Sequence, residues 1–373
     1  KARARAGVVR RRVLMAAMIA SRAAVRYGPR SHHPNPMLIV MKRDATAEEV
    51  AGVVSRVETM GLKANAIPGA QRTAIGITGN LGALDRGSFE SLPGVFDVIR
   101  VSHPFKLVSR EFQPSDTVVQ IGRVAIGGPE VVVIGGPCSI ESYEQTLRLA
   151  QRVRAAGAQL FRGGAYKPRT SPYSFQGLGL PGLEILARVS EEVGLPTVTE
   201  ALDIDVLDAV AEHADVVQIG ARNMQNYTLL KRAGRCGKPI LLKRGMTSTV
   251  TELLLAAEYI LDQGNPNVIL CERGIRTFAD HARNTLDLSA VPAIEKISHL
   301  PVIVDPSHAA GKSGMVRPLA RAAIAAGADG VMIEIHDRPA EALSDSEQAI
   351  LPEEMDRMMN ELRALAPVVD RKM

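Results

Sequence analysis

The sequence predicts an α/β protein, a (β/α)₈ barrel preceded by a small ferredoxin-like domain. Eight short apolar runs alternate with helical patterns over about 235 residues, which is the number of strands and the size of such a barrel. The residues before them follow the order strand, helix, strand, strand, helix, strand, which is the ferredoxin-like plan. A doubly wound open sheet is the weaker alternative, because no Gly-x-Gly-x-x-Gly follows the first barrel run.

Composition places the chain among globular enzymes. Of its 373 residues, 46% are hydrophobic and 23% are charged. There is no tryptophan and only 3% aromatic content, so stacking on nucleic-acid bases is not expected. Three cysteines make no disulfide framework, which favours a cytoplasmic, reducing compartment. The apolar stretch 13–20 is too short to span a bilayer, and no membrane association is expected.

The positive net charge belongs to the amino terminus. Residues 1–36 contain nine lysines and arginines and no acidic residue, so the net charge of +5 becomes −4 for residues 37–373. We interpret 1–36 as a basic extension, expected to be disordered, ahead of a start at Met37. A targeting segment is the alternative, since such segments are also rich in arginine and poor in acids.

Residues 37–104 carry the ferredoxin-like pattern and are interpreted as a regulatory domain. Thr46 and Glu49 form a capping box that begins a helix, and Gly61 ends it. The expected elements are a strand at 38–41, a helix at 46–60, strands at 62–67 and 73–78, a helix at 88–92 and a strand at 95–101. Nothing in this part indicates catalysis, so we expect a role in sensing a small molecule or in assembly.

Residues 105–130 connect the two parts. Within them, 117–121 and 123–126 alternate around Gly122 in the manner of a small hairpin. We expect this hairpin to plug one end of the barrel.

Residues 131–373 are interpreted as the catalytic barrel. Its strand runs are short, rich in β-branched residues and uninterrupted, which is typical of strands buried on both faces. The expected strands are 131–134, 159–161, 197–199, 216–219, 240–242, 268–270, 302–304 and 330–333. Helical patterns separate them, such as 144–155, 183–193, 204–211, 250–263 and 318–326. The first strand is expected to stop at Gly135-Gly136-Pro137.

Four residues of metal-binding types follow strands that become neighbours when the barrel closes. The eighth strand then lies between the seventh and the first, which brings Cys138, His308, Glu334 and Asp345 into one quarter of the mouth. One thiolate, one imidazole and two carboxylates suit a divalent metal ion. Each residue alone would more often be structural, as we expect of the other two cysteines.

Six cations follow the remaining strand ends: Arg162, Lys167, Arg169, Arg222, Lys243 and Arg273. Like charges in a concave site repel one another unless an anion neutralises them. Guanidinium groups pair well with phosphate and carboxylate. The ring of cations is broad enough for two anionic substrates.

Six motifs make the sequence similar to a known family. They are Gly136-Pro137-Cys138-Ser139, the run 161–177 with Lys167-Pro168-Arg169-Thr170 inside it, the runs 218–223 and 242–245, Cys271-Glu272-Arg273-Gly274 with the three residues that follow, and Asp305-Pro306-Ser307-His308. Over 37–366 the chain resembles the type I beta subgroup of 3-deoxy-D-arabino-heptulosonate 7-phosphate (DAHP) synthase, which has an amino-terminal ferredoxin-like regulatory domain.

The resemblance implies an activity and partners. The activity is the metal-dependent condensation of phosphoenolpyruvate with erythrose 4-phosphate and water, which is the first step of the shikimate pathway. Feedback regulation by tyrosine or phenylalanine and assembly as a homotetramer are implied as well. The resemblance further implies a divalent ion such as Mn, Fe, Co or Zn.

It also implies a role for each candidate residue. The metal ligands would be Cys138, His308, Glu334 and Asp345. Phosphoenolpyruvate would be surrounded by Arg162, Lys167, Arg222, Lys243 and Arg273. Arg169 and Thr170 would hold the phosphate of erythrose 4-phosphate. The candidates for proton transfer are Lys167 and His308.

Three alternatives remain open. 3-Deoxy-D-manno-octulosonate 8-phosphate synthase has a similar barrel, but that family carries Lys-Ala-Asn-Arg-Ser where this chain has Lys167-Pro168-Arg169-Thr170. A Schiff-base aldolase using Lys243 is a second reading. A non-enzymatic amino-acid sensor is the third, and it would explain only residues 37–104.

Overall fold

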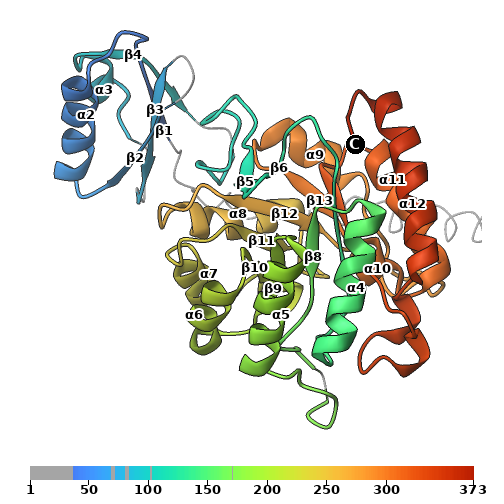
Figure 1. Cartoon of the computed structure of the whole chain (residues 1–373). Coiled ribbons are helices and arrows are strands. Elements are labelled where there is room, and N and C mark those ends of the chain that lie inside the picture. Colours follow the sequence, from blue (N-terminus) through green and yellow to red (C-terminus); the bar gives the residue numbers. More distant parts are fainter. Residues whose placement is uncertain (1–36, 69–71, 80–83, 101–102, 170) are drawn as a thin grey trace, which may run out of the picture.

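The computed structural model describes residues 37–68, 72–79, 84–100, 103–169 and 171–373. The expected extension 1–36 and the candidate residue Thr170 lie outside these ranges. The predicted fold class is confirmed, since a closed parallel β-barrel with surrounding helices follows a small antiparallel sheet (Figure 1). No helix among the described residues is long and apolar enough to cross a membrane.

The amino-terminal sheet has the strand order β2-β3-β1-β4, as the ferredoxin-like plan requires. Its elements are β1 (Met37–Met41), α2 (Ala47–Thr59), β2 (Lys63–Pro68), β3 (Thr73–Thr78), α3 (Gly87–Glu90) and β4 (Val95–Arg100). The expected capping box is present, with Thr46 and Glu49 each bonding the other's backbone N–H. Ile39, Ile75 and Val57 are among the buried residues that join the sheet to its helices.

The barrel has the strand order β10-β11-β12-β13-β14-β7-β8-β9, closed and parallel throughout. Its strands are β7 (Val132–Gly136), β8 (Leu160–Arg162), β9 (Thr197–Ala201), β10 (Val216–Ile219), β11 (Ile240–Lys243), β12 (Val268–Glu272), β13 (Val302–Val304) and β14 (Gly330–Glu334). The longer helices around it are α4 (Tyr143–Ala156), α5 (Leu180–Val193), α6 (Ile204–His213), α7 (Tyr227–Ala233), α8 (Val250–Leu261), α9 (Ala290–Ile297), α11 (Ser313–Ala325) and α12 (Pro352–Leu365). A short helix, α10 (Pro306–Ala310), follows β13 directly.

Several strands run further than the sequence indicates. Arg162, Lys243 and Glu334 are the last residues of their strands instead of the first residues after them, and β12 continues to Glu272, two residues past its expected end. β7 likewise continues through Gly136. The residue there is a glycine because β8 approaches so closely that a Cβ would collide with the Arg162 backbone. The polar ends of the strands are therefore held by the barrel's own hydrogen bonds.

The expected start of α11 at Pro318 is wrong. The helix begins at Ser313, and Pro318 lies inside it. A proline near a helix start removes few backbone hydrogen bonds, so the preceding turn forms as well. Similarly, α5 begins at Leu180 and has a proline in its first turn.

The connecting segment plugs the barrel as expected. Its hairpin consists of β5 (Val119–Ile121) and β6 (Val124–Ile126), which pair in an antiparallel register. Val119 and Ile126 belong to the same buried cluster as Val132, Leu241 and Met332, which line the barrel interior. The hairpin therefore closes the amino-terminal end of the barrel and leaves the other end as its mouth.

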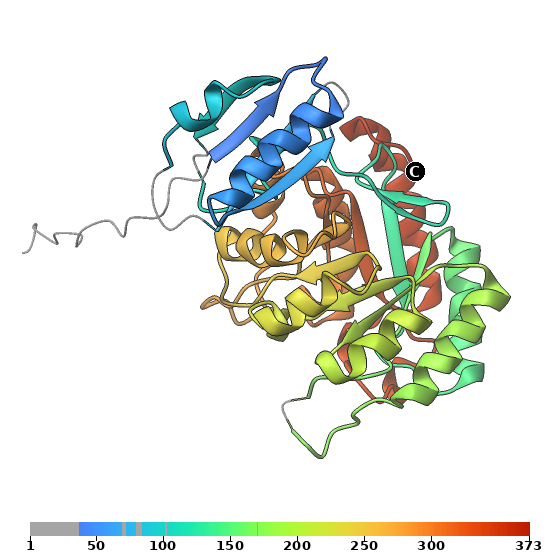
Figure 2. The same ribbon diagram turned by 90° about the vertical axis from the view of Figure 1, so that its left-hand side faces the viewer.

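The ferredoxin-like domain lies at the end that the hairpin closes (Figures 1 and 2). Glu258, in the last turn of α8, accepts hydrogen bonds from the backbone N–H groups of residues 106–108 at 2.8–3.1 Å. Lys63 of β2 pairs with Asp262, just past α8, at 3.0 Å. Barrel helices run antiparallel to the strands, so the end of α8 marks the amino-terminal face. The domain thus lies away from the mouth of its own barrel.

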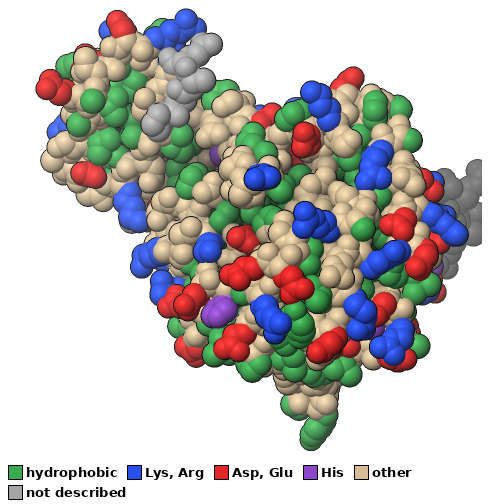
Figure 3. Space-filling view, in the orientation of Figure 1, with side chains coloured by type: hydrophobic (Ala, Val, Ile, Leu, Met, Phe, Trp, Pro, Cys, Tyr) green, Lys and Arg blue, Asp and Glu red, His purple; other side chains and the backbone are tan. Residues whose placement is uncertain are grey.

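The visible surface is that of a solvated protein. Acidic and basic side chains are interspersed over the face shown in Figure 3. Such mixing is ordinary for solvent-exposed helices.

Candidate active site

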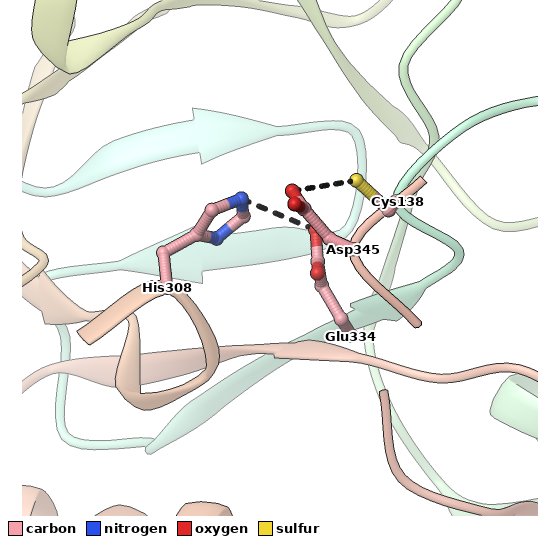
Figure 4. Close-up of side chains that lie close together, drawn as sticks. All are labelled: Cys138, His308, Glu334 and Asp345. Atoms are coloured by element: carbon pink, nitrogen blue, oxygen red, sulfur yellow. Dashed lines mark hydrogen bonds and ion pairs between the residues drawn. The ribbon is translucent and has the colours of Figure 1, made fainter. Parts of the chain in front are cut away.

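Cys138, His308, Glu334 and Asp345 meet at the mouth of the barrel (Figure 4). One ligand atom from each lies within 4.8 Å of all the others. The Cys138 thiol lies 3.3 Å from Asp345 Oδ2, and His308 Nε2 lies 3.2 Å from Glu334 Oε1. The four side chains come from neighbouring parts of the barrel, because β14 lies between β13 and β7.

Local structure aims each of these side chains inward. Glu334 is the last residue of β14, and its backbone N–H donates to Ser307 Oγ at 3.0 Å. His308 lies on α10, whose N-cap Asp305 accepts the backbone N–H of His308 at 2.9 Å. Asp345 has a left-handed backbone with φ of 47°, which is uncommon for a residue other than glycine and often marks a functional position.

The electrostatics of this group suit a cation. Burial raises the pKa of the Cys138 thiol to about 11, and the Glu334 carboxylate adds to the rise. Burial also disfavours charge on Glu334, but His308, Arg162 and Lys167 outweigh it and lower the pKa of Glu334. Two ionised carboxylates beside a thiol and an imidazole form a donor set that fits a divalent metal ion.

Two further carboxylate contacts brace this group. Gln348 Nε2 donates to Glu334 Oε2 at 2.5 Å, and Arg283 donates to Gln348 Oε1 at 2.9 Å. Arg283 also lies 3.3 Å from Asp345 Oδ1. Sequence reasoning missed Arg283 and Gln348, because neither follows a strand end and only the loop paths bring them to the site.

Cations of the ring lie against the metal-binding types. Lys167 Nζ is 2.9 Å from Cys138 Sγ and 2.8 Å from its carbonyl oxygen. Arg162 donates to Glu334 Oε1 at 2.8 Å, and both side chains are buried. Lys243 Nζ lies 2.5 Å from Asp305 Oδ2. The four metal-binding residues and the ring of cations, which follow different strands in the sequence, are therefore in direct contact.

A cavity of about 390 Å³ opens beside these residues at the mouth. Of the predicted site residues, Lys167, Arg169, Arg222, Lys243, Arg273, His308 and Asp345 line it. Arg162 is not among its lining residues, because its guanidinium is turned toward Glu334 and the Pro137 carbonyl. Arg276, Arg283 and Glu200 complete the charged part of the lining.

Arg169 occupies the rim of the cavity nearest the carboxylates. Its Nε donates to the Phe175 carbonyl at 3.1 Å, and its Nη1 lies 4.0 Å from Asp345 Oδ1. Arg222 lies across the cavity on the segment that follows β10 and is exposed. The two guanidiniums are therefore placed to contact different anionic groups.

Asp305 ties two parts of the site together. One of its oxygens, Oδ2, accepts from both Lys243 Nζ and His308 Nδ1, the latter at 2.7 Å. Burial disfavours charge on Asp305, but His308 and Lys243 outweigh it and hold its pKa well below the ordinary value. Because Lys243 is paired with a carboxylate, it is poorly suited to act as a neutral Schiff-base nucleophile.

A second cavity of about 390 Å³ lies at the opposite end of the barrel. Arg110 pairs with Asp116 there at 2.6 Å, and Arg371 pairs with Asp329 at 2.9 Å. Its cations are thus neutralised by carboxylates of the same cavity. It does not share the cation-rich character of the mouth.

Comparisons with known proteins agree with this geometry. Residues 111–369 match the model of the DAHP synthetase I family, and residues 37–103 match that of the DAHP synthase ferredoxin-like domain. Phospho-2-dehydro-3-deoxyheptonate aldolase of Thermotoga maritima is 50% identical over 336 residues, covering 90% of this chain and 99% of the relative. 2-Dehydro-3-deoxyphosphooctonate aldolase of Geotalea uraniireducens is 34% identical over 272 residues, covering 67% of this chain and 98% of the relative.

Solved structures give the same result. The crystal structure of the T. maritima DAHP synthase matches with a TM-score of 0.72 and 49% identity, covering 91% of this chain and 99% of that one. A truncated form of the T. maritima enzyme matches with a TM-score of 0.67 and 49% identity, covering 71% of this chain and 98% of that one.

Proposed function

This chain belongs to the DAHP synthetase I family, and we propose that its barrel mouth condenses phosphoenolpyruvate with erythrose 4-phosphate and water, releasing DAHP and inorganic phosphate. The observation that carries the proposal is the cation-lined cavity in direct contact with the Cys-His-Glu-Asp group. The cavity suits two phosphorylated substrates, and the Cys-His-Glu-Asp group suits a divalent metal ion.

In this proposal Cys138, His308, Glu334 and Asp345 hold the metal ion, which is Mn, Fe, Co or Zn. When bound, the ion supplies a Lewis acid that polarises the aldehyde of the sugar phosphate. The remaining work belongs to the protein's side chains, which bind the two anions, hold them together and move protons.

Phosphoenolpyruvate is assigned to the cations Arg162, Lys167, Arg222, Lys243 and Arg273. Lys167, Lys243 and Arg273 are buried at the cavity wall, where charge-assisted hydrogen bonds are strong. Erythrose 4-phosphate is assigned to Arg169 and Thr170 at the rim. Arg169 lies 4.0 Å from Asp345 Oδ1, which supports placing this substrate beside the metal-binding group.

The bond changes follow from this placement. Carbon 3 of phosphoenolpyruvate attacks the aldehyde carbon, whose oxygen gains a proton. Water adds at carbon 2 and loses a proton, and phosphate leaves with cleavage of its bond to that carbon. The arginines hold two like-charged substrates at reacting distance, which is a positioning task.

Lys167 and His308 are the candidates for proton transfer, and their contacts support Lys167. His308 already uses Nδ1 for Asp305, and its Nε2 faces Glu334. Lys167 Nζ lies at the cavity wall between Cys138 and the substrate space. An ammonium there can donate the proton that the aldehyde oxygen requires.

The regulatory part of the proposal concerns residues 37–104. We propose that this domain senses tyrosine or phenylalanine, that 105–130 is the linker, and that 131–373 is the catalytic unit of a homotetramer. Since the domain lies at the closed end of its own barrel, it would cover a mouth only in another subunit. Otherwise its effect would have to pass through the barrel.

One assay tests the activity. Phosphate release from phosphoenolpyruvate is followed with erythrose 4-phosphate, with arabinose 5-phosphate or with neither, before and after chelation. We expect release only with erythrose 4-phosphate, loss on chelation and recovery with Mn²⁺. Preference for arabinose 5-phosphate would favour the octulosonate alternative, and full activity of a verified metal-free preparation would exclude the metal assignment.

A further inference from the structure

Three of the site's cations, Lys167, Arg162 and Lys243, are paired with different parts of the metal-binding group. Lys167 contacts Cys138, and Arg162 contacts Glu334. The third pair is indirect, because Lys243 contacts Asp305, which in turn contacts His308. Among the groups that accept from these three cations, Asp305 is therefore the one that is not itself a member of the metal-binding group.

The geometry around Asp305 makes its two partners compete. Lys243 Nζ and His308 Nδ1 both donate to the same oxygen, Oδ2, at 2.5 and 2.7 Å. The other oxygen, Oδ1, is used by the backbone N–H of His308. Asp305 is fully buried, so water cannot take the place of either partner.

From this geometry we propose that Asp305 is a positioning residue that couples metal binding to phosphoenolpyruvate binding. Its contact with Nδ1 keeps the proton of His308 there and leaves the Nε2 lone pair for the metal ion. When Nε2 gives its lone pair to a cation, Nδ1–H becomes a stronger donor and takes a larger share of Oδ2. Lys243 is then less tightly held and more able to bind an anionic substrate.

The inference rests on the proposed function, because it takes the anion beside Lys243 to be phosphoenolpyruvate. It predicts positive coupling, so that each ligand tightens the binding of the other by the same factor. Coupling between two sites typically amounts to roughly 5- to 150-fold. Direct attraction between the metal ion and the anion contributes to that factor, so the test must isolate the part that Asp305 carries.

Asp305→Asn is the informative change. Asparagine keeps the shape of the residue and the oxygen that caps α10, and it is itself a good N-cap residue. It replaces the shared acceptor with an NH₂ group, which cannot accept from Lys243 or His308. Asp203→Asn is the matched control, because Asp203 is also an N-cap, bonds only the Asp205 and Val206 amides, and is exposed.

The experiment measures binding and needs no turnover. Calorimetry gives the affinity for phosphoenolpyruvate in the metal-free and the Mn²⁺-loaded protein, and competition with a chromophoric chelator gives the affinity for Mn²⁺. In Asp305→Asn we expect weaker metal binding, tighter phosphoenolpyruvate binding by the metal-free form, and a coupling factor at least about threefold smaller than in the unmodified protein. Asp203→Asn should match the unmodified protein.

The tighter binding by the metal-free variant separates this role from a merely structural one. General damage to the site would weaken both ligands, whereas loss of the competing carboxylate frees Lys243 for the substrate. A coupling factor unchanged in Asp305→Asn overturns the inference while leaving the proposed function in place. Failure of both proteins to bind phosphoenolpyruvate overturns the proposed function and the inference with it.

A second variant tests the inference even where Asp305→Asn does not fold. Lys243→Gln removes the competing cation and leaves Oδ2 to His308. We expect Mn²⁺ to bind this variant about threefold or more tightly in the absence of substrate, while phosphoenolpyruvate binds less tightly. Unchanged or weaker metal binding by Lys243→Gln contradicts the competition at Asp305.

Discussion

At the scale of single residues, the same side-chain type has different roles in different surroundings. Cys138 and Cys271 are both buried, and burial raises the pKa of both thiols. Cys138 faces Asp345 and Lys167 at the mouth, whereas Cys271 packs in the barrel interior with Ile269 and Ile303. Position, and not the thiol itself, separates the proposed metal ligand from a packing residue.

Replacing these cysteines should therefore have opposite effects. Cys138→Ala is expected to remove most of the bound metal while changing the unfolding free energy by no more than about 2 kcal/mol. Cys271→Ala should retain the metal and lose about 1–3 kcal/mol, because it leaves a cavity in a packed interior. Metal analysis and denaturant unfolding on both variants check this, and retained metal in Cys138→Ala would remove Cys138 from the ligand set.

The positions of Arg169 and Arg222 make a second prediction at this scale. Arg169 lies at the rim beside Asp345, and Arg222 lies across the cavity. Losing a charge-assisted contact to an anion costs about 2–5 kcal/mol. Arg169→Ala should raise KM mainly for erythrose 4-phosphate and Arg222→Ala mainly for phosphoenolpyruvate, each by at least about 30-fold. Equal effects on both substrates in both variants would contradict the assignment.

At the scale of elements, the connecting segment is joined to the barrel by hydrogen bonds as well as by its hairpin. His299 Nδ1 lies 2.7 Å from Thr117 Oγ1, and Nε2 lies 2.7 Å from the Leu107 carbonyl. The Leu107 carbonyl can only accept, so Nε2 carries a proton, and burial, which lowers the pKa of His299, favours the form in which Nδ1 accepts from the Thr117 hydroxyl. The imidazole is therefore neutral, with its proton on Nε2.

The hydrogen bonds of His299 to the connecting segment should weaken in acid. Burial lowers the pKa of His299 below its ordinary value of 6.5, so the unfolded chain binds a proton there at a pH where the folded chain does not. The contribution of neutral His299 to stability is fully present above about pH 6.5. It decreases as the pH falls toward the pKa of His299 in the folded protein, by at most about 1.4 kcal/mol per pH unit. Between pH 7.5 and pH 5, the free energy of unfolding measured in urea should fall more steeply for the unmodified protein than for His299→Gln. Parallel curves for the two proteins would exclude His299 as a source of this pH dependence.

At the scale of the whole molecule, the domain and the mouth lie at opposite ends of one chain. The outer face of the domain's sheet packs on the linker, where Phe112 lies against Gly76 of β3. Leu107 and Phe112 are buried there and would lose part of their cover without the domain. The regulation proposed for this domain would therefore share a contact surface with the domain's contribution to stability.

Deleting residues 1–104 should accordingly abolish feedback inhibition and leave condensation in place. We expect a loss of stability as well, because apolar surface of the linker becomes exposed. The cut should go no further than residue 104, so that Phe105 and Leu107 remain. Titration of tyrosine and phenylalanine against both forms checks this, and unchanged inhibition of the truncated enzyme would refute a sensing role for the domain.

Phenylalanine should inhibit at least as well as tyrosine. The strand β2 offers few side-chain partners for a phenol, and the Asn65 amide already lies 3.4 Å from Thr78 Oγ1. A buried hydroxyl without a partner costs about 1–3 kcal/mol, and phenylalanine carries no such cost. A strong preference for tyrosine in the same titration would show that another group receives its hydroxyl.

The sequence by itself determined the fold class and the residue types at the mouth. Alternation of apolar runs with helical patterns is a local property, and so is the capping box at Thr46. Strand order in a closed barrel then follows from the order along the chain, which is why Cys138 and Glu334 could be placed together from sequence. These features depend on short-range chemistry and on one topological rule.

Only the tertiary structure decided how the side chains pair. The burial of Arg162 against Glu334, the sharing of Asp305 between Lys243 and His308, and the approach of Arg283 all depend on side-chain directions and loop paths. The placement of the ferredoxin-like domain at the closed end depends on contacts between residues far apart in the chain, such as Lys63 with Asp262. Spacing in a sequence cannot express such contacts, because packing of the whole chain selects among many local arrangements of similar energy.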